Sequence, residues 1–197
     1  MVKFTTREIR DIIISMFVIS LAFAFIFSRT NLNNVIFYLP ITLVVVGFGF
    51  ILHELAHKFV AIKYGYWAEF RMWTQGLIFA LITAYFGIVF AAPGAVYIHG
   101  YHIKTSENGI ISLAGPATNI FLALIFLSIF FISQNSLLSY IAILGVTVNS
   151  FLAVFNLIPF FIWDGAKIFR WNPIIWALTM GVALIVWVYS IFGINII

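Results

Sequence analysis

The sequence contains no cysteine and very little charge. Of its 197 residues, 64% are hydrophobic and only 8% are Asp, Glu, Lys or Arg. Without cysteine there can be no disulfide, no thiolate metal ligand and no cysteine nucleophile. A soluble domain could not bury so much apolar surface, so the composition indicates a multi-pass integral membrane protein. No basic patch interleaved with aromatic residues is present, which argues against a nucleic-acid partner.

Long apolar runs separated by short polar links predict an all-α polytopic membrane protein. Because roughly 20 apolar residues cross a bilayer, we expect about six membrane-embedded helical segments. Between the second run and the fourth, the aromatic segment 64–74 and the segment 94–98 predict a small membrane-associated β region. The runs cover residues 11–28, 35–63, 75–92, 114–132, 137–158 and 173–192.

The basic residues favour a cytoplasmic N-terminus. If residues 75–98 re-enter or lie in the membrane without crossing it, every Lys and Arg except Arg29 falls on the N-terminal side. We therefore prefer the non-crossing topology for this segment. The polar link 100–109 is expected to be an exposed loop, and Lys58 and Lys63 are expected to reach the membrane interface.

The stretch 47–63, GFGFILHELAHKFVAIK, carries two histidines and a glutamate within an apolar run. His53 and His57 stand four residues apart, so both imidazoles leave the same face of a helix and can bind one ion. Glu54 beside them could accept a proton from water, as a general base does. Each ionisable group in a spanning helix costs on the order of 3 kcal/mol and usually marks a functional site. A third ligand must come from elsewhere in the chain.

The segment 114–119, AGPATN, opens the fourth apolar run. Pro116 suits the first turn of a helix, and Gly115 would let that helix approach a neighbour closely. Asn119, just inside the membrane, needs a hydrogen-bond partner.

A third motif begins at the end of the fifth run and continues beyond it, with Asn156, Pro159, Asp164 and Gly165. Pro159 should end the helix near residue 158. Asp164 lies among aromatic residues, where a carboxylate is costly unless it meets a cation. For His99 and His102, in a flexible interfacial segment, ordinary solvated side chains are the favoured interpretation and metal binding is the alternative.

Together, HELAH at 53–57, AGPATN at 114–119 and N-x-x-P-x-x-x-x-D-G at 156–165 resemble the site-2 protease family of intramembrane zinc metalloproteases. The resemblance implies that one Zn²⁺ per chain is held by His53, His57 and Asp164, with Glu54 as the base. It also implies that Asn156 faces the active site and helps to hold the substrate or its oxyanion. By the same likeness, the supporting residues are Gly115, Pro116, Asn119, Pro159 and Gly165. We expect a single integral membrane protease domain over residues 1–197, with its catalytic core at about 35–170.

The implied activity is hydrolysis of a peptide bond within or near a transmembrane segment of a membrane-protein substrate, as in regulated intramembrane proteolysis. The main alternative is a membrane metal-ion transporter or channel with the same ligands, which leaves the position of Glu54 unexplained. An inactive scaffold that binds helices is disfavoured because the ligand and base positions are complete. No G-x-S serine and no pair of intramembrane aspartates supports the other intramembrane protease classes. The expected partners are the substrate and the lipid bilayer, and a homo-oligomer is compatible with the sequence.

Overall fold

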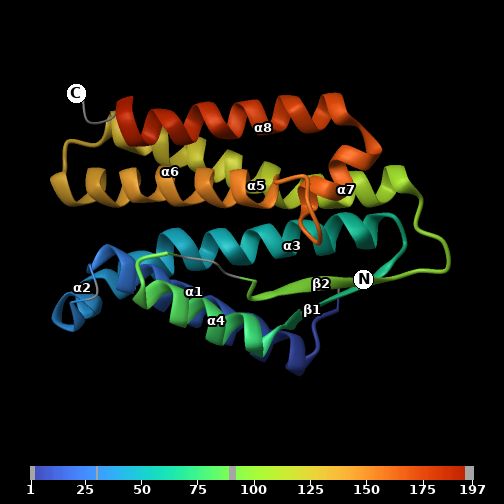
Figure 1. Ribbon diagram of the computed structural model, residues 1–197, viewed down its shortest axis with the longest axis horizontal. Helices are drawn as coiled ribbons and strands as arrows, with labels where there is room; N and C mark the ends of the chain where they lie inside the picture. Colours follow the sequence, from blue (N-terminus) through green and yellow to red (C-terminus); the bar gives the residue numbers. More distant parts are fainter. Residues whose placement is uncertain (1–2, 30, 89–91, 194–197) are drawn as a thin grey trace.

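The computed structural model describes residues 3–29, 31–88 and 92–193. Its long helices run roughly side by side along the longest axis of the molecule (Figure 1). Within the described ranges, five helices are long and apolar enough to cross a membrane. The all-α multi-pass prediction agrees with these helices, which are Thr6–Phe27 (α1), Leu32–Lys63, Thr105–Ile132 (α5), Ser136–Asn156 (α6) and Pro173–Gly193.

The second of these helices is built from three parts. A short helix, Leu32–Thr42 (α2), continues through a π-helical segment, Leu43–Gly47, into Phe48–Lys63 (α3). The HELAH motif therefore lies well inside α3, as predicted. Wider π turns leave the regular hydrogen-bond pattern of a helix and often accompany functional sites.

Within the part that the structure describes, the third apolar run, residues 75–92, does not form a long helix, so the sixth spanning segment is not found. Thr74–Tyr85 (α4) has 12 residues, which at 1.5 Å per residue is about 18 Å, well short of the roughly 30 Å of a hydrocarbon core. Strands Trp67–Met72 (β1) and Gly94–His99 (β2) flank α4 and pair with each other in antiparallel register. The predicted small β region is confirmed. Residues 89–91 of the predicted run lie outside the described residues.

One edge of this hairpin is covered and the other is open. The Phe70 N–H of β1 points away from β2 and donates to Glu8 Oε1 at 3.0 Å. Trp73 N–H donates to Pro93 O at 3.0 Å, and because antiparallel pairs alternate, the backbone groups of Gly94, Val96 and Ile98 face away from β1. Among the described residues no third strand joins the sheet, so β2 has a free edge, at which the Val96 backbone hydrogen-bonds to the Glu54 carboxylate.

The chain bends sharply after α6. This helix ends at Asn156, ahead of Pro159 as predicted, and a short loop leads to Asp164–Trp171 (α7). Pro173–Val188 (α8) then begins with its proline in the first turn, where the missing N–H costs no helical bond. Figure 1 shows α8 and α6 on the opposite side of α3 from the β hairpin.

The start of α5 was predicted too late. The helix begins at Thr105, so half of the expected loop 100–109 is helical and Pro116 lies in the helix interior instead of the first turn. Its first turn is polar and gives no apolar signal, yet Glu107 Oε2 accepts a hydrogen bond from the Lys104 backbone N–H at 3.1 Å and caps it.

The expectation that Lys58 reaches the interface is wrong. Its ammonium group lies 2.6 and 2.5 Å from the two carboxylate oxygens of Glu8, and both side chains are almost fully buried. The Lys3 carbonyl accepts a further bond from Lys58 Nζ at 2.9 Å. Since Glu8 also accepts from the Phe70 N–H, one ion pair joins α1, α3 and β1.

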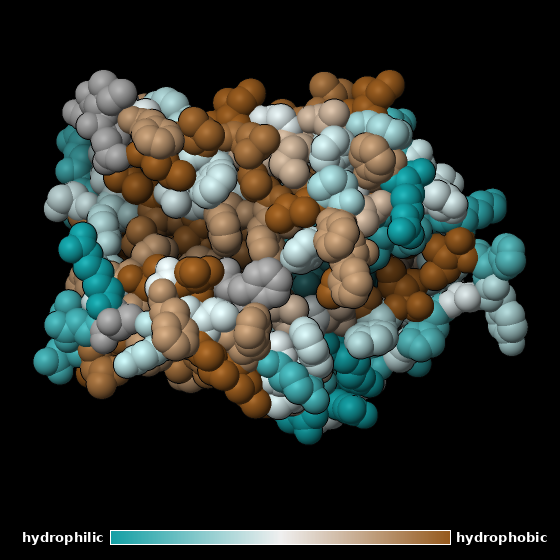
Figure 2. All heavy atoms as spheres, in the orientation of Figure 1, coloured by the Kyte–Doolittle hydropathy of each residue, from teal (hydrophilic) through white to brown (hydrophobic). Residues whose placement is uncertain are grey.

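The face seen in Figure 2 is apolar in the middle and hydrophilic toward its ends, as the apolar runs and polar links of the sequence suggest. In Figure 2 apolar residues form most of the middle of the molecule, and hydrophilic residues gather mainly toward its two ends and along the lower right edge. Such a distribution suits a bundle whose middle lies in hydrocarbon.

We predict that Lys58→Met lowers the free energy of unfolding by about 3–5 kcal/mol, because it leaves the buried Glu8 carboxylate without its cation. The double variant Glu8→Gln/Lys58→Met should recover much of this loss, since Gln keeps an acceptor for the Phe70 N–H. Unfolding in detergent measures both. Lys104→Met, which removes an exposed partner of Glu107, is the control and should change stability by less than about 1 kcal/mol. Equal effects of the Lys58 and Lys104 changes would contradict the prediction.

Candidate metal centre

Three side chains that could bind a metal meet between α3 and α7. His53 and His57 project from α3 one turn apart, and their Nε2 atoms lie 3.0 Å from each other. Asp164 Oδ2 lies 3.4 Å from His53 Nε2 and 3.0 Å from His57 Nε2. All three residues are buried. The structure thus brings together the three residues that the sequence singled out as ligands.

Hydrogen bonds at the far side of each imidazole set which nitrogen faces the cluster. His57 Nδ1 lies 2.7 Å from the Ile111 carbonyl oxygen, which can only accept. His53 Nδ1 lies 2.6 Å from Asn119 Oδ1, also an acceptor. Both rings must therefore carry their proton on Nδ1, and in the neutral rings the Nε2 lone pairs face each other and Asp164.

Asp164 is positioned by the tight packing of α7 against the end of α6. Gly165 follows it, and a Cβ there would collide with the Leu157 carbonyl oxygen. The Trp176 indole N–H donates to that same oxygen at 2.7 Å, which fixes the end of α6 to α8. Lys167 Nζ lies 3.5 Å from Asp164 Oδ1, the oxygen that does not face the histidines.

The cluster fits a zinc ion. Two unprotonated nitrogens and a carboxylate oxygen converge with lone pairs toward one point, an arrangement that needs a cation. Zinc bonds of about 2.0–2.1 Å in tetrahedral geometry separate neighbouring ligand atoms by about 3.3 Å, close to the spacing found here. Each histidine also has the outer hydrogen bond that is usual for a zinc ligand. Two histidines and one carboxylate leave a fourth position open, which is the pattern of catalytic zinc.

Gly115 on α5 lies directly against the two imidazoles. A Cβ at this position would collide with His57 Nε2 and with the His53 ring. Pro116 and Asn119, from the same motif, are buried in the same helix. The close approach of α5 to α3 that was predicted from Gly115 is thus present, although Pro116 does not begin the helix.

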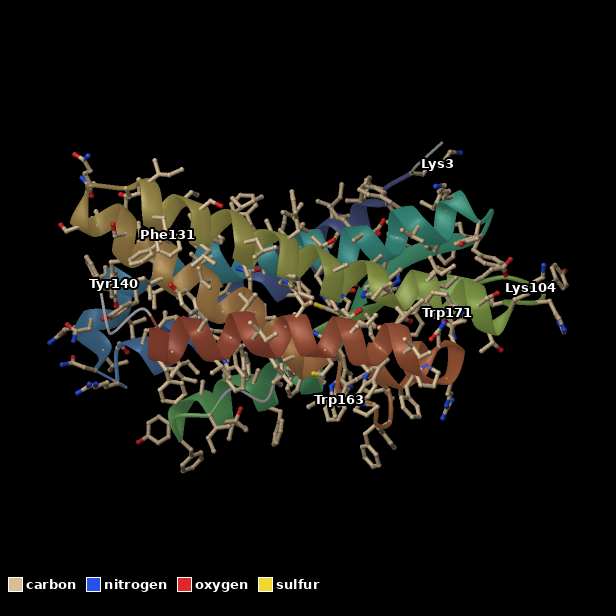
Figure 3. The ribbon with its side chains drawn as sticks, turned by 90° about the horizontal axis from the view of Figure 1, so that it is seen from above. Lys3, Lys104, Phe131, Tyr140, Trp163 and Trp171 are labelled. Atoms are coloured by element: carbon tan, nitrogen blue, oxygen red, sulfur yellow. The ribbon has the colours of Figure 1, made fainter. Side chains whose placement is uncertain are left out.

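A cavity of about 190 Å³ opens beside the cluster. Glu54, Asn156 and Lys167 line it together with the free edge of β2, at Gly94, Val96 and Ile98. Its other walls are largely apolar and include Phe155 and Trp163. In Figure 3 the labelled Trp163 lies between the two ends of the molecule, which Lys3 and Lys104 mark on one side and Phe131 and Tyr140 on the other.

Several residues of this centre were not found from the sequence. Ile111 acts through its backbone, which no sequence pattern reveals. Asn149 is fully buried and hydrogen-bonded to Asn119, and its signal was available, since an amide within an apolar helix needs a partner. His99 and His102, by contrast, lie exposed outside the cluster, in line with the solvated interpretation.

The fold and the site define a multi-pass helical membrane protein with a buried site for a catalytic metal. The chain is 49% identical, over 185 residues, to a protein of Methanocaldococcus jannaschii named "Putative zinc metalloprotease", and the match covers 93% of each chain. The chain therefore belongs to the same family of zinc metalloproteases, and its cofactor is zinc. No profile of a protein family matches the chain, and no solved structure gives a significant match.

We predict that Gly115→Ala weakens zinc binding by about 10-fold or more, because the added methyl group displaces both imidazoles from their outer hydrogen bonds. Competition with a chelator measures the zinc affinity of the purified protein. The matched control is Gly181→Ala on α8, where an added Cβ meets nothing within 4 Å. Wild-type affinity in Gly115→Ala would show that the glycine does not shape the site.

Proposed function

We propose that this protein is an intramembrane zinc metalloprotease of the site-2 protease type, which cleaves a transmembrane segment of a membrane-protein substrate. The observation that carries the proposal is the convergence of His53, His57 and Asp164 beside Glu54 within a bundle of long apolar helices. We further propose these three residues as the zinc ligands and residues 1–197 as one protease domain. A transporter needs ligands of this kind but has no use for a carboxylate placed as a base.

Glu54 is the proposed general base. It is buried, adjoins His53 on α3 and lines the cavity in which a peptide carbonyl would meet the metal. When bound, zinc supplies Lewis-acid polarisation of the carbonyl and of the attacking water. Glu54 takes the proton of that water and can then deliver it to the leaving amine.

Asn156 is the proposed donor to the oxyanion. Its Nδ2 donates one hydrogen to the Leu152 carbonyl at 2.9 Å, which holds the amide in place at the end of α6. An amide nitrogen carries two hydrogens, so one remains for a substrate in the cavity. A donor held rigidly in this way stabilises developing negative charge effectively.

The free edge of β2 is the proposed docking place of the substrate. A transmembrane helix has its backbone bonds satisfied internally, so it must unwind before a peptide bond can be cut. The outward groups of Gly94 and Ile98 and the outward C=O of Val96 can take over those bonds by strand addition. Because these residues line the metal cavity, a strand paired there lies beside Glu54 and the ligands.

The membrane placement is part of the proposal. A cytoplasmic N-terminus follows from the distribution of Lys and Arg, and an unwound substrate segment is the proposed partner at the site. The bilayer surrounds the apolar middle of the bundle.

We predict that Glu54→Gln keeps zinc near one ion per chain and lowers turnover of a single-span membrane substrate by about 10²–10⁴-fold, because the base is lost while the ligands remain. Asp164→Ala should instead lower the zinc content. Purified protein in detergent, with metal analysis and a cleavage assay, provides both measurements. Zinc flux into vesicles that is unaffected by Glu54→Gln, with no cleavage by the wild type, would favour the transporter.

We predict that Ile98→Pro raises KM for a membrane substrate, since proline removes an outward N–H of the free edge without breaking the bonds between β1 and β2. Ile98→Ala is the matched control, because it shortens the side chain and keeps the N–H. Cleavage kinetics with the same substrate compare the two variants. If both variants behave alike, the edge does not receive the substrate through its backbone.

A further inference from the structure

Two buried asparagines connect the proposed zinc ligand His53 to backbone carbonyls of α3, α6 and the π-helical segment. Asn119 lies on α5 and Asn149 on α6, and neither side chain is exposed at all. Asn119 Nδ2 donates to Asn149 Oδ1 at 3.1 Å and to the Gly49 carbonyl at 3.3 Å. Asn149 in turn contacts carbonyls of the π-helical segment and of its own helix. Buried amides in a membrane bundle are costly unless every polar atom has a partner.

The orientation of Asn149 follows from its surroundings. Its Nδ2 lies 3.0 Å from the Val45 carbonyl and 3.0 Å from the Gly145 carbonyl. Carbonyl oxygens only accept hydrogen bonds, so both hydrogens of this amide are used and the nitrogen must face them. Asn149 Oδ1 is then left facing Asn119, where it can only accept.

The orientation of Asn119 follows from that of Asn149. The two groups around its Nδ2, Asn149 Oδ1 and the Gly49 carbonyl, are both acceptors, so the amide nitrogen must face them. Asn119 Oδ1 is thereby turned toward His53 Nδ1, 2.6 Å away. An acceptor at this distance requires a proton on Nδ1, which leaves the Nε2 lone pair for a metal.

The surrounding backbone is shaped to hold this arrangement. A Cβ on Gly49 would collide with Asn149 Oδ1, so the absence of a side chain there lets α6 approach α3. The Val45 carbonyl belongs to the π-helical segment, where the wider turn departs from the regular helical bonding pattern. Asn149 therefore joins the π-helical segment to α6 directly, and joins α3 to α6 through Asn119.

We propose that Asn149 is a positioning residue for the zinc site, which fixes the tautomer and the orientation of His53 through Asn119. This inference rests on the proposed role of His53 as a zinc ligand. Asn149 itself contacts neither the metal cluster nor the cavity; its effect passes through the amide of Asn119. Outer hydrogen bonds of this kind change metal affinity by about 10–100-fold when they are lost.

A double-mutant cycle in zinc affinity tests the proposal. Asn149→Leu and Asn119→Leu should each weaken zinc binding by about 10-fold or more. The double variant should bind zinc no more weakly than Asn119→Leu alone, since Asn149 acts only through Asn119. Losses that multiply in the double variant, or wild-type affinity in Asn149→Leu, would overturn the proposal. Asn149→Ala repeats the measurement with a smaller side chain, in case Leu does not pack.

Ser150→Ala is the matched control. Ser150 is the next residue of α6, is fully buried, and its hydroxyl donates to the Val146 carbonyl of its own helix at 2.6 Å. Removal of this hydroxyl should leave zinc affinity unchanged. The comparison separates the effect that Asn149 has through Asn119 from a general loosening of α6. Chelator competition on the full chain in detergent, with the thermal midpoint of the metal-free protein recorded for each variant, provides the comparison.

The tautomer of His53 gives a second readout that does not depend on zinc. In metal-free protein labelled with ¹⁵N-histidine, NMR should show His53 protonated on Nδ1 in the wild type and a mixture of tautomers in Asn149→Leu. An unchanged tautomer would overturn the proposal. His53→Ala separates failure of the proposed zinc site from failure of the positioning role of Asn149. If His53→Ala binds zinc like the wild type, the proposed zinc site is wrong as well. If His53→Ala loses zinc but the asparagine variants do not, only the positioning role is wrong.

Discussion

The hydrogen bonds from the Nδ1 atoms of His53 and His57 determine which imidazole nitrogens face the proposed metal site. Each imidazole leaves α3 into an apolar interior, where a ring free to turn could present either nitrogen. The Ile111 carbonyl and the Asn119 side chain, both on α5, remove that freedom. As a result the two Nε2 atoms and the Asp164 carboxylate meet at the spacing that a tetrahedral ion requires. The packing of α5 against α3, made close by Gly115, is therefore also the condition for metal binding.

A buried ion pair joins the β hairpin to the same helix. Lys58 follows His57 directly, and its ion pair with Glu8 connects α3 to α1, while Glu8 also holds the backbone of β1 at Phe70. Strand β2 pairs with β1, and β1 is held by Glu8, whose partner Lys58 is the residue after His57. The proposed ligands and the strand edge keep a fixed relation because both depend on α3.

Features with a local sequence signal could be predicted, and features that depend on distant pairing could not. Short-range patterns predict three features: the placement of His53 and His57 on one helical face, the helix end before Pro159, and the strand-like segments on either side of α4. Bringing Asp164 to the histidines required the resemblance to a known family, since no spacing links α7 to α3. The partner of Lys58 lies 50 residues away, and nothing near Lys58 indicates it. Pro116 was misplaced because proline preferences describe exposed helix starts better than the interior of a long, well-packed helix.

The π-helical segment Leu43–Gly47 has a consequence for how the chain can change length. A π turn accommodates one extra residue within a helix, so α2 and α3 keep the directions that their own contacts require. Loss of one residue from this segment would yield an ordinary α-helix with the HELAH face still turned toward α5. The same deletion would move the Val45 carbonyl, which accepts a hydrogen bond from Asn149. A change in the length of this helix would therefore affect the asparagine pair before it affected the direction in which the backbone presents His53 and His57.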